Sequence, residues 1–183
     1  MDRDRVVRAV VGDDEAFSQL VADTEPDVRR TAYMILRDVE QANDAVQNAL
    51  VAAWRGVRRL RDPDRFEAWL HRLTVRAALQ VARAERHRCR NETAITDLCR
   101  LPRVESGHDL VVIRDQLDRA FVRLTERERA VLVLRYHLDL SVGQAAEVLA
   151  IPPGTVKSRL HHGHRALKAA MDTEERAAVE ATG

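Results

Sequence analysis

Aromatic residues make up only 4% of this 183-residue sequence, which also has only seven glycines and five prolines. This scarcity argues against a sandwich, a barrel or a collagen-like chain. Two cysteines, ten positions apart, are too few for a disulfide framework. No apolar run approaches the roughly 18 residues of a membrane span, and nothing near the N-terminus resembles a secretory signal. We therefore expect a cytosolic protein that does not insert into membranes by itself.

The charge is unevenly distributed along the chain, although the formal net charge is only +1. Residues 58–90 carry ten arginines against four acidic residues, and residues 157–171 carry four basic residues and no acidic one. The first 57 residues carry eleven acidic residues against seven basic ones. Two separate basic blocks are more typical of contacts with a polyanion than of one solvated face. The pattern favours nucleic-acid binding.

Apolar residues recur at helical spacing through the first half of the chain and predict a three- or four-helix bundle over residues 1–86. One apolar stripe covers residues 39–57 and a second begins at residue 66. Proline lacks the amide hydrogen that an inner helical turn needs, so we expect Pro26 to interrupt the helix in which it lies. Three aromatic side chains fall at core spacing in the two stripes: Trp54, Phe66 and Trp69.

The periodicity lapses between residues 87 and 108, which indicates an exposed linker. Two capping boxes then mark helix starts, Thr125 with Glu128 and Ser141 with Gln144. We predict an all-α chain of two small helical domains joined by a flexible linker. The predicted limits are 1–88 for the first domain, 89–108 for the linker, 109–175 for the second domain and 176–183 for a tail.

The second domain contains the pattern of a helix-turn-helix. A short helix opens at Ser141, and residues 150–154 cannot continue it because they include two prolines and a glycine. Pro153 suits the first position of the next helix, which carries apolar residues on one side and basic residues on the other. Such a second helix has the size and charge to enter a major groove. The alternative is a helical hairpin with a solvated basic face.

Five segments together resemble one family, the bacterial sigma factors of the extracytoplasmic-function group. The resemblance covers nearly all of residues 12–171, and the ordered set is more specific than any one piece. These segments are Asp13–Leu20, Asp44–Trp54, Phe66–Leu70, Leu124–Leu132 and Gly154–Leu160.

The resemblance implies that the chain binds core RNA polymerase, directs it to the minus-35 and minus-10 elements of promoter DNA, and helps to open the duplex. It also implies an anti-sigma protein that holds the factor inactive between inductions. We expect no cofactor and no metal. The sequence itself contains no phosphate loop, dinucleotide glycine motif or nucleophile elbow, so we expect no enzymatic activity.

The resemblance assigns three sets of residues. The polymerase-binding set is Asp44, Gln47 and Asn48. The minus-10 set is Arg58, Arg59, Arg61, Arg65, Arg72 and Arg76. The minus-35 set is Thr155, Lys157, Ser158, Arg159, His161, His162 and Arg165. The chain departs from the family's usual residues at Asn48, His71, Arg76, Gln80, His161 and His162, and these departures leave the preferred promoter sequence open.

Other readings of the sequence remain. The chain could be an autonomous repressor or activator that dimerises through its first domain, or a module that binds acidic proteins. The basic block at residues 58–90 disfavours both, because neither needs a second basic site in the other domain. His161 and His164, three positions apart on one helix, could hold zinc. Cys89 and Cys99 could also hold zinc, or they could form a redox pair.

Overall fold

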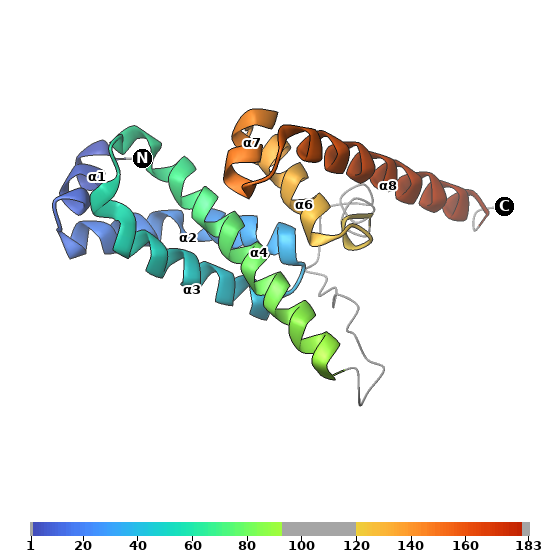
Figure 1. Cartoon of the computed structure of the whole chain (residues 1–183), viewed down its shortest axis with the longest axis horizontal. Helices are drawn as coiled ribbons and strands as arrows, with labels where there is room; N and C mark the ends of the chain where they lie inside the picture. Colours follow the sequence, from blue (N-terminus) through green and yellow to red (C-terminus); the bar gives the residue numbers. More distant parts are fainter. Residues whose placement is uncertain (1, 93–119, 181–183) are drawn as a thin grey trace. The chain divides into compact units, whose positions relative to one another are not determined.

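A computed structural model describes residues 2–92 and 120–180 of the chain. The chain divides into two compact units, Met1–Cys99 and Arg100–Gly183. The helices of each unit are labelled in Figure 1. The predicted linker falls largely on residues outside the described ranges, although its first four residues, 89–92, continue the preceding helix.

The first unit is a helical bundle, as predicted. Asp2, Asp13 and Asp38 cap the first three helices, and each side chain accepts a hydrogen bond from a backbone amide in the first turn. Figure 1 shows α2, α3 and α4 packed along one another, with the short α1 against α2. The elements are α1 (Arg3–Val10), α2 (Asp14–Leu36), α3 (Val39–Gly56), the 3-10 turns η1 (Val57–Arg59) and η2 (Pro63–Arg65), and α4 (Phe66–Glu92).

The core of the first unit lies among α2, α3 and α4, each of which contributes buried side chains. Its largest fully buried side chains include Leu20 of α2 and Phe66 of α4. Trp69 packs against the end of α3, since a Cβ placed on Gly56 would lie 3.2 Å from the indole Cζ2. The prediction of a core position is therefore confirmed for Phe66, whereas Trp69 is half-buried.

Two predictions for this unit are wrong. Helix α2 continues through Pro26, because buried residues on both sides of the proline, Phe17 before it and Val28 after it among them, hold the two halves to the same core. Trp54 is 54% exposed rather than buried. The buried stripe of α3 follows Ala49 and Ala53, and Trp54 lies one residue past that stripe, on the edge of the helix.

The second unit contains the predicted pair of helices with a tight turn between them. Both capping boxes are present, with Thr125 and Ser141 as the N-caps. The apolar run 131–134 is helical. The elements are α6 (Glu126–Leu132), the π-helical turn η3 (Val133–His137), α7 (Val142–Leu149) and α8 (Pro153–Glu180).

The core of the second unit is small and includes a charged residue. Val131 and Val156 are fully buried, and Gly163 lets α8 approach α6, since a Cβ there would lie 3.2 Å from Leu132 Cδ1. Arg129 is only 3% exposed, and its Nη1 donates to the backbone oxygens of Leu124 at 2.8 Å and Phe121 at 3.2 Å. The Arg129 guanidinium therefore donates hydrogen bonds to backbone carbonyls just before α6 that would otherwise lack a partner in the helix.

None of the helices in residues 2–92 and 120–180 combines the length and the apolar character that crossing a membrane requires.

Candidate functional site

The turn between α7 and α8 has the geometry of a helix-turn-helix. Ala150 ends α7 in the left-handed region, with φ at 51°. The Ile151 amide then donates to the Ala146 oxygen at 3.1 Å, which closes the end of the helix. Pro153 is the first residue of α8, as predicted. The turn thus fixes the direction in which α8 leaves the unit.

Helix α8 buries one face and exposes the other. Val156 and Leu160 lie on the buried face. Residues 155 and 159 are half-buried at its edge. The remaining members of the minus-35 set are exposed together: Lys157, Ser158, His161, His162 and Arg165. The structure therefore exposes five of the seven predicted residues on α8 and leaves Thr155 and Arg159 at the edge of that face.

Arg127 extends this basic surface from another helix. Burial lowers the pKa of the Arg159 guanidinium, and the positive charge of Arg127 lowers that pKa further. Two guanidinium groups, one from the first turn of α6 and one from α8, thus repel each other at the edge of the exposed face. A phosphate between them would offset this repulsion. Sequence reasoning missed Arg127, because only the packing of α6 against α8 brings the two residues together.

The histidines of α8 have different surroundings. The rings of His161 and His162 are exposed, and their centroids are 6.0 Å apart. His164 Nε2 instead lies 2.9 Å from the hydroxyl of Tyr136, which is 63% exposed. In the part of the chain that the structure describes, no three His, Cys, Asp or Glu side chains are grouped to hold a metal ion.

The arginines of the minus-10 set lie on a loop and on the helix that follows it. The loop connects α3 to α4 and exposes Arg58, Arg59, Arg61 and Arg65. Its acidic residues are engaged: Asp62 pairs with Arg65 at 3.1 Å, and Asp64 pairs with Arg3 of α1 at 3.2 Å. Exposed ion pairs of this kind contribute little to stability.

The other two members of the set, Arg72 and Arg76, lie one turn apart on α4 but differ in exposure. Arg76 is exposed, whereas Arg72 is half-buried. The Arg72 Nε is buried and has no hydrogen-bond partner among the described residues. The structure therefore offers Arg76 to a ligand more openly than Arg72.

The polymerase-binding set occupies one side of α3. Asp44, Gln47 and Asn48 are all exposed and lie within a single helical turn. The neighbouring Asn43 accepts a hydrogen bond from Arg29 of α2. An exposed carboxylate with two amides suits a partner that offers arginine or lysine side chains.

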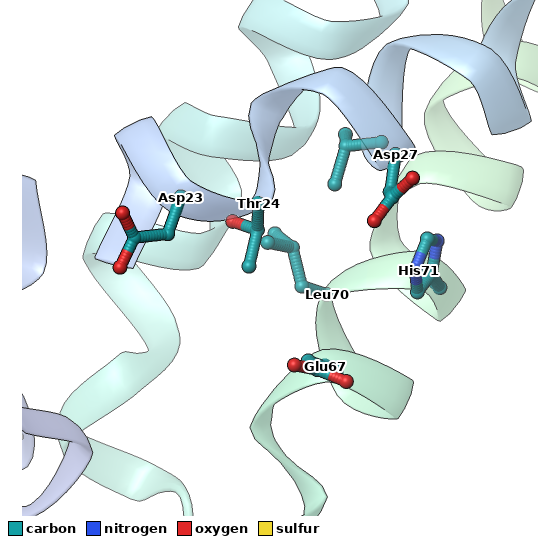
Figure 2. Close-up of a pocket in the computed structure, with 7 residues that line it drawn as sticks. Asp23, Thr24, Asp27, Glu67, Leu70 and His71 are labelled. Carbon is teal, nitrogen blue, oxygen red and sulfur yellow. The ribbon is translucent and has the colours of Figure 1, made fainter. Parts of the chain in front are cut away.

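An acidic pocket of about 240 Å³ lies between α2 and α4. Figure 2 shows Asp23 and Asp27 entering it from α2, and Glu67 and His71 from α4. Nδ1 of His71 lies 3.1 Å from the hydroxyl of Thr31. Three carboxylates make this pocket unsuitable for a phosphate.

Cys89, near the end of α4, is disulfide-bonded. The sequence left two roles open for Cys89 with Cys99, a zinc site and a redox pair. Cys99, the other cysteine of the chain, lies outside the described residues.

Two family models match the chain. The model described as Sigma-70 region 2 matches residues 5–88, and the model described as Sigma-70, region 4 matches residues 114–169. The first match spans the α3–α4 loop and the polymerase-binding set. The second match spans the helix-turn-helix.

Two curated relatives are similar over most of the chain. ECF RNA polymerase sigma factor SigW of Bacillus subtilis is 27% identical over 178 residues, which are 92% of this chain and 95% of that protein. ECF RNA polymerase sigma factor SigM of Mycobacterium tuberculosis is 30% identical over 158 residues, which are 86% of this chain and 78% of that protein.

A solved structure has the same fold. It is the sigma factor RpoE from Bartonella quintana, in complex with the anti-sigma factor NepR. The TM-score is 0.67 at 20% sequence identity, and the match covers 85% of this chain and 96% of that one.

Proposed function

Because the chain belongs to the extracytoplasmic-function group of sigma factors, we propose that it binds core RNA polymerase, recognises the minus-35 and minus-10 elements of its promoters and assists their opening. The observation that carries the proposal is the exposed basic face of α8, which follows a helix-turn-helix turn. Its place of action is the cytoplasm, where core polymerase and DNA meet.

Each unit has its own task in this proposal. The region predicted as the first domain, residues 1–88, binds polymerase through Asp44, Gln47 and Asn48 and the minus-10 strand through the arginine loop. The region predicted as the second domain, residues 109–175, reads the minus-35 element. Each of the two DNA-binding surfaces is small and binds DNA weakly alone. Both contribute to tight binding of one promoter only when a scaffold fixes the spacing between them, so promoter binding requires core polymerase.

An anti-sigma protein is the third proposed partner. The Bartonella sigma factor of the same fold was solved with its anti-sigma factor bound. For this chain we expect a protein that blocks its assembly with core polymerase and has no effect on the preformed holoenzyme. The chain itself supplies recognition rather than catalysis.

Transcription of sheared genomic DNA by purified core polymerase, with and without the chain, tests the proposal. Sequencing of the RNA 5′ ends should reveal starts that depend on the chain and share elements near minus-35 and minus-10. Lys157→Ala should weaken binding to these promoters and reduce the salt slope by about one unit. Lys168→Ala is the matched control, since Lys168 is an exposed lysine farther along α8.

Two results would contradict the proposal. One is the absence of any start that depends on the chain. The other is tight binding of a palindromic site by the free protein at physiological salt, which would identify a dimeric repressor or activator.

A further inference from the structure

The acidic pocket between α2 and α4 contains one histidine among its carboxylates. Two fully buried side chains, Val28 and Leu70, form the apolar part of its lining. Among the described residues that line the pocket, none comes from α3. The histidine therefore faces the charges of α2 and of its own helix. The titratable residues of the lining are Asp23 and Asp27 of α2 and Glu67 and His71 of α4 (Figure 2).

A buried threonine holds the His71 ring and determines which of its nitrogens titrates. Nδ1 of His71 lies 3.1 Å from Oγ1 of Thr31, whose side chain is completely buried. The Thr31 hydroxyl donates its one hydrogen to the backbone oxygen of Asp27 at 2.9 Å. Toward His71 this hydroxyl can therefore only accept, and Nδ1 carries a proton in both charge states of the ring. The nitrogen that gains or loses a proton is Nε2.

Two carboxylates are placed to meet the charged form of this ring. Figure 2 shows the Asp27 carboxylate pointing toward the His71 ring. Glu67 precedes His71 by four residues on α4, a spacing that brings a carboxylate and a following cation onto one face of a helix. The third carboxylate, Asp23, is engaged by Arg5 of α1, whose Nη1 donates to it at 2.6 Å.

We propose that His71 is a pH-sensitive contact between α2 and α4. With Nε2 protonated, the imidazolium pairs with the carboxylates of Asp27 and Glu67, while Nδ1 keeps its hydrogen bond to Thr31. With Nε2 deprotonated, the same carboxylates face a lone pair, and the contribution of the ion pairs is lost. Position 71 is one at which the chain departs from the residues usual in its family, so we expect this contact in this chain rather than throughout the family.

The sign of the pH dependence follows from these contacts. A histidine has an ordinary pKa of about 6.5, so its charge changes between about pH 8 and about pH 6. The protonated ring gains its ion pairs only in the folded state, so in this range the folded chain binds more protons than the unfolded chain. The first unit should therefore become more stable as the pH falls from about 8 to about 6 and less stable as it rises again.

Urea unfolding of the full-length chain at pH 8 and at pH 6 tests the proposal. Tryptophan fluorescence reports on the first unit, because both tryptophans belong to it. The urea midpoint of the wild type should be about 0.3 M higher at pH 6, the size expected for a partly exposed ion pair. His71→Gln, which keeps a hydrogen-bond donor but does not titrate, should lose this difference. His87→Gln is the matched control and should keep it, since His87 is exposed on the same helix and does not line the pocket.

Two further measurements test the partners of the ring. Asp27 and Glu67 are exposed, so the double variant Asp27→Asn, Glu67→Gln should fold. It should lose the difference between pH 8 and pH 6 although His71 is still present. Nitrogen-15 NMR of the imidazole in the wild type distinguishes the two ring nitrogens. Nδ1 should stay protonated throughout the range, and Nε2 should titrate.

Three results would each overturn the proposal. The first is an equal pH difference in the wild type and in His71→Gln. The second is a wild-type midpoint that falls between pH 8 and pH 6, which would show that the folded chain favours the uncharged ring. The third is titration of Nδ1 rather than Nε2. If His71→Gln does not fold, the double variant takes its place, because a full pH difference without the two carboxylates would also overturn the proposal.

Discussion

The two units start their helices with different chemistry. In the first unit, α1, α2, α3 and η2 are all capped by aspartates. In the second unit, α6 and α7 are capped by the hydroxyls of Thr125 and Ser141, each within a capping box. A carboxylate is a stronger acceptor than a hydroxyl and favours the positive end of the helix dipole, but it loses its charge in acid. The caps of the first unit therefore depend on pH. In the second unit the Glu128 carboxylate of the α6 capping box also titrates, whereas the Ser141–Gln144 box of α7 contains no titratable group.

The cores of the two units differ as well. The first unit buries an aromatic ring, Phe66, among large aliphatic side chains from two long helices. In the described part of the second unit, the fully buried side chains are aliphatic, and Arg129 lies among them. A small core gains stability from hydrogen bonds that leave no carbonyl unsatisfied. The first unit thus depends mainly on packing, and the second depends in part on a polar network.

The largest expected effect is the loss of packing in the first unit. Phe66→Ala should lower its free energy of unfolding by about 3–5 kcal/mol, because the substitution removes a fully buried ring. Trp54→Ala, which removes an exposed ring, should cost far less. Urea unfolding monitored by circular dichroism measures both. Equal costs would contradict the contrast between the two aromatic positions.

Arg129→Met should have the next largest effect and should act on the second unit. Methionine can fill the space but cannot donate to the oxygens of Phe121 and Leu124. Hydrogen bonds to charged groups contribute about 1.5–3 kcal/mol, so we expect a loss of about 2–3 kcal/mol. Amide hydrogen exchange over residues 120–169 measures the effect.

Tryptophan fluorescence provides the complementary measurement, since both tryptophans, Trp54 and Trp69, belong to the first unit. The fluorescence transition should be unchanged in Arg129→Met. Arg123→Ala is the control, because Arg123 is exposed. Faster exchange confined to the second unit would support the role of the buried guanidinium, and unchanged exchange there would refute it.

Replacement of alanine by glycine should stabilise the protein at one position and destabilise it at another. Ala150 has a φ of 51°, a conformation that costs residues other than glycine about 1–2 kcal/mol. Ala150→Gly should therefore stabilise the second unit, by about 0.5–1 kcal/mol after the greater entropy of glycine in the unfolded chain is counted. Ala52→Gly, at an exposed position inside α3, should destabilise the first unit by about 1 kcal/mol. Hydrogen exchange in each unit measures the two signs.

The sequence predicted the features that local chemistry determines. The capping boxes, the helical start at Pro153 and the exposed basic face of α8 all follow from residues within a few positions of one another. The errors have tertiary causes. In α2, packing on both sides of Pro26 outweighs the backbone hydrogen bond that proline cannot donate. In α3, Trp54 lies just outside the stripe of buried residues, although its spacing in the sequence fits that stripe.

The candidate residues that the sequence missed belong to contacts between elements. Arg127 approaches Arg159 because α6 packs against α8. A pocket lined by Gly12, Trp54 and Arg58 forms where the α1–α2 turn meets the end of α3. No spacing within one segment could indicate either juxtaposition. Burial of Arg129 is equally invisible in a chain where most arginines are solvated.

The smallest expected effect concerns the aspartate caps. Hydrogen bonding from the Ala16 amide, and then from Arg8, lowers the pKa of Asp13 below its ordinary value of 3.8. A carboxyl group whose pKa is lower in the folded state than in the unfolded state contributes stability above the unfolded value. This contribution is lost as the pH falls from 3.8 through the folded pKa. Hydrogen bonding from Arg5 lowers the pKa of the Asp2 cap in the same direction.

Asp13→Asn removes this dependence while keeping an acceptor for the helix. Asparagine is as good an N-cap as aspartate but does not titrate. The urea midpoint of the first unit, monitored by tryptophan fluorescence, should fall less steeply below pH 3.8 in the variant than in the wild type. At pH 6 the variant should be slightly less stable, because it lacks the ion pair with Arg8. Ser141→Asn, a neutral exchange at a hydroxyl cap, should leave the pH dependence of hydrogen exchange in the second unit unchanged. If the urea midpoints of Asp13→Asn and the wild type fell equally steeply below pH 3.8, the charge of the Asp13 cap would not contribute to the acid sensitivity of the first unit.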